Sequence, residues 1–241
     1  HGMKNHKNSG GKISAGNIFS FNRLGLSDSM EDGTSLTFGI DYKREEKIKE
    51  SNDKEKAAKD VLDFFELKLA TVIRTKEEEN IPTTSTINKK NSNIVGAINY
   101  SSSEYLSLNY DFSIDNELKA FEYNSIDAEL TYNNFSTTIK FLEETGVIGT
   151  AHILQNSFRY DFFNNNSLEF NTRRNKEINL TEYYDLVYEY KNDCLTARVE
   201  FKKQFYNNAD IKPLEELYFS ITIVPLGTFS PEPIIPKSVF N

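Results

Sequence analysis

Apolar and polar side chains alternate along most of this chain. Between residues 104 and 115, one parity carries polar residues and the other carries apolar ones, namely Leu106, Leu108, Tyr110, Phe112 and Ile114. Because the side chains of a β-strand point alternately to its two faces, this period of two predicts a strand with one apolar face. The same alternation recurs at about 34–43, 93–101, 134–143, 153–163, 166–174, 180–190, 195–205 and 215–224. With less regular stretches included, the pattern predicts about eleven strands, most of them about nine to twelve residues long.

Short polar turns separate many of the predicted strands. Asp115-Asn116 and Asn133-Asn134 are of the residue types that tolerate left-handed backbone conformations, and 164–166 and 191–193 are of the same kind. Turns this short join antiparallel neighbours, so the predicted fold is an all-β antiparallel meander. Soluble strands average ~5–6 residues, whereas a tilted membrane strand needs ~9–11. The strand lengths therefore favour a transmembrane β-barrel over a soluble β-sandwich.

One stretch, 53–74, fits two structures equally well. Phe65, Leu69 and Val72 lie on one stripe of a helix. The strand-like alternation of Phe65, Leu67 and Leu69 is only partial. Periodicity alone leaves strand and helix open here.

Charge and hydropathy remove several classes of function. The chain has 28 basic and 36 acidic residues, for a formal net charge of −8, and this balance gives no electrostatic reason to expect a nucleic-acid partner. No run approaches the ~20 apolar residues of a transmembrane helix, and the mean hydropathy is −0.56. Barrel strands need only alternate residues to be apolar, so a β-barrel remains compatible with this composition.

Few residues of the sequence suggest catalysis or metal binding. His1, His6 and His152 do not have metal-ligand spacing, and the sequence lacks a nucleophile–base signature. We therefore predict no enzymatic activity, no catalytic or metal-binding residues and no cofactor. Cys194 is the single cysteine, which rules out a disulfide within the chain. It is either a small, partly buried residue or half of a bridge to a cysteine outside this piece.

The polar faces of the strands are the better candidate for function. They carry charged residues opposite the apolar ones: Arg159, Asp161, Glu169, Arg173, Arg198, Glu200 and Lys202. In a membrane barrel this face lines the lumen, because Arg or Lys at the lipid midplane costs ~2–4 kcal/mol. In a soluble sheet the same residues would face solvent.

Two stretches resemble a known family. Residues 17–42 read NIFSFNRLGLSDSMEDGTSLTFGIDY, and 173–225 contain YEYKNDCLTARVEF and most of EELYFSITIVPLG, which continues to residue 227. Both look like the LptD family of lipopolysaccharide-assembly outer-membrane proteins, also called organic solvent tolerance proteins, particularly in its alphaproteobacterial form. Residues 81–100 also look like the family and favour a strand immediately before them. The resemblance spans about 17–227 and implies the C-terminal part of a large transmembrane β-barrel in the cell outer membrane.

The resemblance also implies a function and partners. The family inserts lipopolysaccharide into the outer leaflet through a lateral opening between the first and last strands. Expected partners are lipopolysaccharide, an LptE-like plug lipoprotein, a periplasmic lipopolysaccharide-bridge protein that docks on a preceding domain, and the barrel-assembly machinery. On this mapping the last strand, 215–224, is one lip of the opening and presents an apolar face: Leu217, Phe219, Ile221 and Ile223. Cys194 matches the position of barrel cysteines that pair with cysteines near the N-terminus, although well-known members have two adjacent cysteines there.

Three parts of the chain follow from this interpretation. Residues 1–16 are expected to be a start that is disordered or foreign to the natural protein, 17–227 the barrel portion, and 228–241 an extended tail rich in proline. A diffusion pore or surface-binding outer-membrane barrel is the alternative function. A soluble β-sandwich binding module is the third hypothesis.

Overall fold

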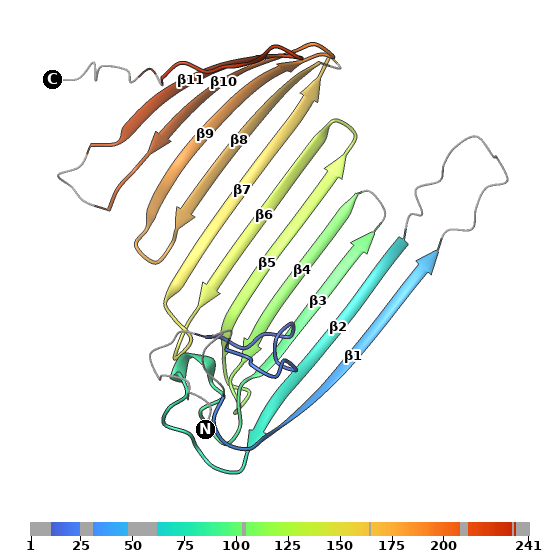
Figure 1. Cartoon of the computed structure of the whole chain (residues 1–241), viewed down its shortest axis with the longest axis vertical. Helices are drawn as coiled ribbons and strands as arrows, with labels where there is room; N and C mark the ends of the chain where they lie inside the picture. Colours follow the sequence, from blue (N-terminus) through green and yellow to red (C-terminus); the bar gives the residue numbers. More distant parts are fainter. Residues whose placement is uncertain are drawn as a thin grey trace. The chain divides into compact units, whose positions relative to one another are not determined.

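A computed structural model describes residues 11–24, 31–47, 62–102, 105–163, 165–207, 212–232 and 234. Across these residues the chain forms a twelve-stranded sheet in which the strand order follows the sequence, with antiparallel neighbours (Figure 1). This confirms the all-β antiparallel meander. None of the helical structure in the described ranges is long and apolar enough to cross a membrane.

Strands β1 to β11 have about the lengths that the alternating pattern predicts, and a short twelfth strand, β12, follows them. Their bounds are β1 Ser35–Lys47, β2 Leu62–Arg74, β3 Ile94–Ser102, β4 Leu106–Ile114, β5 Phe121–Tyr132, β6 Phe135–Glu144, β7 Ala151–Phe162, β8 Asn166–Asn175, β9 Leu180–Lys191, β10 Leu195–Gln204, β11 Leu214–Ile223 and β12 Gly227–Phe229, with one 3₁₀ turn, η1, at Thr83–Ser85. From β1 to β11 the strands are long enough to span a bilayer at a tilt.

The ambiguous stretch is a strand where it is described. Residues 62–74 form β2, which pairs with β1 along its whole length and with β3 on its other edge. Residues 53–61 lie outside the described residues. Both edges of β2 are hydrogen-bonded to neighbours, and this pairing stabilises a strand where local periodicity does not choose between strand and helix.

The chain divides into two compact units, each considered by itself below. Unit 1 contains residues 1–128 and 141–151, and unit 2 contains 129–140 and 152–241.

In unit 1, the apolar face of the sheet is exposed. On β1 the side chains of Leu36, Phe38, Ile40 and Tyr42 are between 51% and 69% exposed. The register pairs Ile40 with Leu69 on this face. A soluble sheet buries such a face, so an exposed row of this length indicates contact with an apolar environment.

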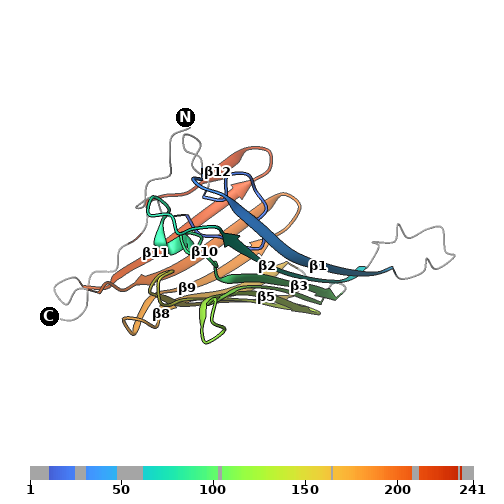
Figure 2. The same ribbon diagram turned by 90° about the horizontal axis from the view of Figure 1, so that it is seen from below.

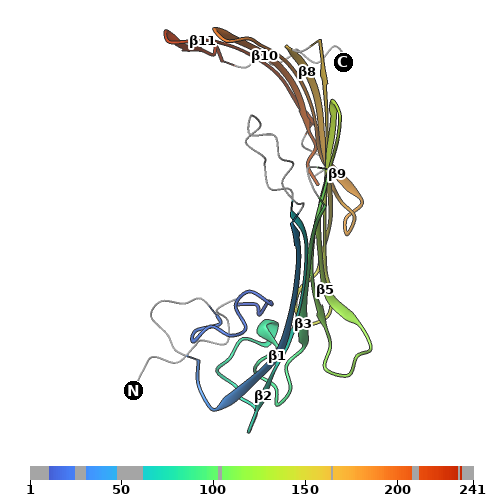
Figure 3. The ribbon, with the colours of Figure 1, turned by 90° about the vertical axis from the view of Figure 1, so that its right-hand side faces the viewer.

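The small core of unit 1 lies on the opposite, polar face. Two segments cover that face near one end of the strands: residues 11–24 and the β2–β3 connection 75–93, which we call the inner cover. Figure 3 shows the first segment and η1 on the same side of β1, β2 and β3. The strands of the sheet are called the wall. Apolar side chains of the cover pack on wall residues of β2 and β3: Ile18, Leu24, Ile81 and Ile87 lie against Ala70, Val72 and Val95.

In unit 2, the register separates the side chains into apolar and polar rows. One row crosses β7 to β11 as Phe158, Phe170, Leu186, Phe201 and Leu217. The next row, on the other face, is Arg159, Glu169, Val187, Glu200 and Tyr218. A register shift between Arg173 and Arg174 interrupts the β8–β9 ladder near its end. The apolar and polar positions that alternate in the sequence thus lie on opposite faces of the sheet in unit 2.

Candidate functional site

The polar residues predicted from unit 2 lie on one face of its sheet. The register carries the face from Arg159 to Glu169 and on to Glu200 through Val187. Adjacent rows of the same face contain Asp161 and Arg198, then Lys202, then Arg173. The structure therefore brings all seven residues together on the face opposite Phe158 and Phe170.

Opposite charges on this face are paired. The Arg159 guanidinium lies 3.1 Å from the Asp161 carboxylate, 3.8 Å from that of Glu169 and 4.0 Å from that of Glu189. Arg198 donates to Glu200 at 2.9 Å. Arg173 pairs with Glu182 at 2.7 Å. Most of these side chains are partly exposed, so each pair contributes little stability and the face remains available to a polar ligand.

Two hollows open on the polar face of unit 2. One, of about 580 Å³, lies beside the turns after β7 and β9 and is lined by Arg159, Asp161, Glu189, Lys191 and neighbouring Asn side chains. The other, of about 230 Å³, lies on β10 and β11 and includes Arg198, Lys202, Tyr218 and Ser220. Mixed charges, amides and hydroxyls suit hydrogen bonding to sugars and phosphates. The described residues hold no group of three or more His, Cys, Asp or Glu arranged to bind a metal ion.

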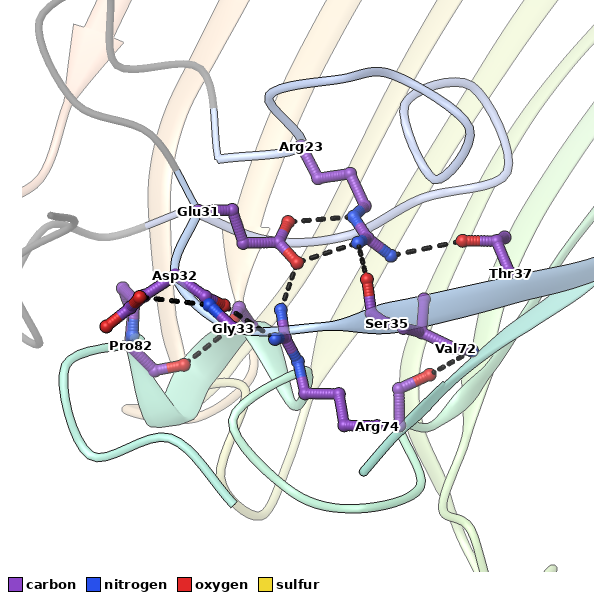
Figure 4. Close-up of polar contacts among 11 residues, drawn as sticks. Arg23, Glu31, Asp32, Gly33, Ser35, Thr37, Val72, Arg74 and Pro82 are labelled. Atoms are coloured by element: carbon purple, nitrogen blue, oxygen red, sulfur yellow. Dashed lines mark hydrogen bonds and ion pairs between the residues drawn. The ribbon is translucent and has the colours of Figure 1, made fainter. Parts of the chain in front are cut away.

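A buried cluster of charges holds the inner cover of unit 1 in place (Figure 4). Arg23 of the cover donates to both carboxylate oxygens of Glu31, at 2.8 and 2.7 Å. Arg74, at the end of β2, also donates to Glu31 and reaches the Asp32 carbonyl at 2.8 Å. The three side chains are at most 8% exposed. We call Arg23, Glu31 and Arg74 the latch.

Further hydrogen bonds attach the latch and the cover to the wall. Arg23 donates to the hydroxyls of Ser35 at 2.6 Å and Thr37 at 3.2 Å, both on β1. At the other end of the first segment, the Lys12 ammonium pairs with Glu144 of β6 at 2.6 Å. This site cannot be predicted from the sequence pattern, because the latch residues lie far apart in sequence and share no periodicity. The only signal was an arginine at the end of an apolar run, which is too weak to single out.

The strand assigned to the lateral opening is not the last one described. β11 spans Leu214–Ile223, and its Leu217, Phe219, Ile221 and Ile223 share one face as expected. The chain then turns back, and β12 pairs with the edge of β11 that β10 does not occupy; Figure 2 labels β12 there. Residues 228 and 229 of the expected tail therefore belong to a strand, which begins at residue 227.

Cys194 lies in the β9–β10 turn and has an exposed, free thiol. Its backbone N–H donates to the Asn192 side chain at 3.0 Å, and its carbonyl accepts from the Val224 N–H at 2.9 Å. The backbone is fixed while the sulfur is accessible. This exposure does not fit the interpretation of Cys194 as a small, partly buried residue.

A family model decides between the barrel and the soluble sheet. The model described as "LptD: LPS transport system D" matches residues 8–144, which is more than half of the chain. The chain belongs to the LptD family. No curated protein sequence matches significantly. Of the solved structures, a mutant of the porin of Rh. blastica is similar, with 13% identity, a TM-score of 0.40, and coverage of 82% of this chain and 87% of the porin chain.

Membership of the LptD family gives the exposed apolar faces a physical explanation. The chain is an outer-membrane β-barrel protein, and such barrels present apolar side chains to lipid and polar ones to their interior. The matched range contains β1 to β6 and the whole inner cover. The stretch 173–225, on which the resemblance also rested, lies outside that range.

Proposed function

We propose that this chain is part of the wall of a translocon that inserts lipopolysaccharide into the outer leaflet through a lateral opening at β11, without covalent chemistry. The observation that carries the proposal is the two-faced sheet, in which β11 is the last long strand described. The polar face offers amides and paired charges to sugars and phosphates, while Leu217 and Phe219 on the other face of β11 suit acyl chains. Family membership supports transport of lipopolysaccharide as the context.

The inner cover favours this function over a diffusion pore. In unit 1 the cover packs over the polar face with fully buried residues such as Ile18 and Ile87, fixed by the latch. A water-filled pore needs that face open. Lipopolysaccharide that leaves sideways through the barrel wall does not need that face to be open.

The partners follow from the same proposal. We expect an LptE-like plug lipoprotein against the polar faces, a periplasmic bridge protein that delivers lipopolysaccharide to a preceding domain, and the barrel-assembly machinery during insertion. The chain is proposed to supply the C-terminal part of the complete barrel. Arg159, Asp161, Glu169, Arg173, Arg198, Glu200 and Lys202 are proposed to face the lumen.

Adjacent residues of β11 provide the test of lipopolysaccharide passage. A photo-crosslinking amino acid at Ser220, on the polar face, is expected to capture lipopolysaccharide sugars in full-length protein in cells. At Phe219 the same probe is expected to capture phospholipid or acyl chains instead. The readout is an immunoblot for lipopolysaccharide on the crosslinked protein. If folded protein gives no lipopolysaccharide adduct at either position, the proposed function is contradicted.

We further propose that Cys194 forms a disulfide with a cysteine outside the chain, on the periplasmic side. In unit 2, β7 is joined to β8, and β9 to β10, at one end of the strands, while β10 is joined to β11 at the other end through a longer stretch of sequence. Outer-membrane barrels have short periplasmic turns and longer outer loops. The turn with Cys194 is therefore expected at the oxidising periplasmic end, where a bridge to a periplasmic domain can form.

Cys194→Ser tests this bridge. Full-length protein from cells is expected to migrate differently on non-reducing and reducing gels, and the substitution is expected to abolish the difference. Cys194→Ala is the matched control for the hydroxyl that serine introduces, and it is expected to behave in the same way. An unchanged mobility difference in either variant would show that Cys194 is not bridged.

A further inference from the structure

The outer edge of β11 is occupied by the residues that follow it. β12 pairs Gly227, Thr228 and Phe229 with Ile223, Thr222 and Ile221. Ile234 then exchanges two backbone hydrogen bonds with Leu217, each of 2.9 Å. We call Gly227–Phe229 and Ile234 together the tail strand.

This pairing is weaker than an ordinary barrel contact. β10 pairs with β11 from Leu214 to Ile223 without interruption. Among the described residues, the tail strand pairs only at its two ends, and Pro231 between them has no N–H to donate. Its apolar side chains are little packed, because Phe229 and Ile234 are 66% and 62% exposed. The tail strand is held by its backbone and by the contact between the Thr222 and Thr228 hydroxyls at 2.8 Å.

A closed barrel needs the edge that the tail strand occupies. In lipid, every backbone N–H and C=O must be satisfied, so the strands at the two ends of a barrel sheet pair with each other. The strand that closes the barrel against β11 needs the same N–H and C=O groups of Leu217, Ile221 and Ile223. The two pairings therefore exclude one another.

We propose that the tail strand is an edge guard: it covers β11 before the barrel closes and is displaced by the closing strand. An uncovered edge of this length is a template for pairing with other chains, and short strands with proline are a common means of blocking it. The guard needs only enough stability to prevent aggregation, and its sparse pairing makes it easy to replace. This inference rests on closure of an outer-membrane barrel and is independent of what the barrel transports.

A reversible lock on the tail strand tests the proposal. T222C and T228C, in a Cys194→Ser background, place two thiols where the hydroxyls now lie 2.8 Å apart. Full-length protein oxidised in urea and then transferred to detergent micelles is expected to lose the compact, heat-modifiable band of a closed barrel. The same protein refolded with reductant is expected to regain it. Closure of the oxidised protein to the same extent as the reduced protein overturns the proposal.

Two further variants separate the guard from general damage. K191C with T196C, in the same background, locks the β9–β10 hairpin across its register, and that hairpin is retained on closure; its oxidation is expected to leave folding unchanged. If this control also loses the band, the failure comes from any local lock and the guard is refuted. Protein truncated after Leu226 is expected to close but to aggregate more before closure. Failure of the truncated protein to close would make the tail strand a permanent part of the wall and would also refute the guard.

Discussion

Glu31→Gln is expected to destabilise unit 1 by about 3–5 kcal/mol, the loss that follows when a buried ion pair loses one partner. Glu31 accepts from two guanidinium groups, those of Arg23 and Arg74, and all three side chains are almost fully buried. A neutral amide cannot compensate two buried positive charges, and its NH₂ group would point a donor at one of them. Arg23 would keep its hydrogen bonds to Ser35 and Thr37, which would hold part of the cover in place.

The measurement is protection of the inner cover in full-length protein. Limited proteolysis between 11 and 24, and urea-dependent loss of the heat-modifiable band, are both expected to shift to milder conditions. Glu117→Gln is the matched control, because Glu117 pairs with Lys119 in the exposed β4–β5 turn. That pair is solvated, so its loss is expected to leave both readouts unchanged. Equal behaviour of the two variants would show that the latch does not hold the cover.

The faces of the strands could be predicted from sequence, because one physical rule fixes them. In a strand that alternates in polarity and is bounded by short turns, the alternation and the turns together set the pairing register with the next strand. Consecutive residues such as Phe158 and Arg159 must then point to opposite faces. The register confirms this for unit 2 from β7 to β11. The same rule failed to decide 53–74, where apolar residues occur at both spacings. Pairing with β1 and β3, which is not local information, decides the described part.

The inner cover and the tail strand could not be predicted for a different reason. The cover is held by contacts between residues far apart in the chain, such as Lys12 with Glu144 and Arg23 with Glu31 and Arg74. These contacts leave no periodic trace. β12 is only three residues long and lies in a proline-rich segment, which by itself indicates an extended chain. Its edge pairing depends on what β11 exposes.

Phe158→Arg is expected to lower the stability of the barrel in a bilayer by about 2–4 kcal/mol, the cost of Arg on the lipid face near the midplane. Phe158 lies in the middle of β7, opposite Phe170, and stacks on Phe135 with ring centroids 6.4 Å apart. Arginine removes this packing and places a charge among apolar neighbours. The measurement is urea-induced unfolding of full-length protein in lipid vesicles, followed by the heat-modifiable band.

The adjacent residue provides a control that uses the same strand and the same introduced side chain. Ser157 pairs with Asn171 on the polar face, so Ser157→Arg places the guanidinium toward the carboxylates of that face. The cost there is expected to be small, because solvated charges already line the face. The difference between the two variants is larger than either measurement error if Phe158 faces lipid. Equal stability loss would mean that both faces meet the same environment, and would contradict the assignment of Phe158 to lipid and of the polar face to the barrel interior.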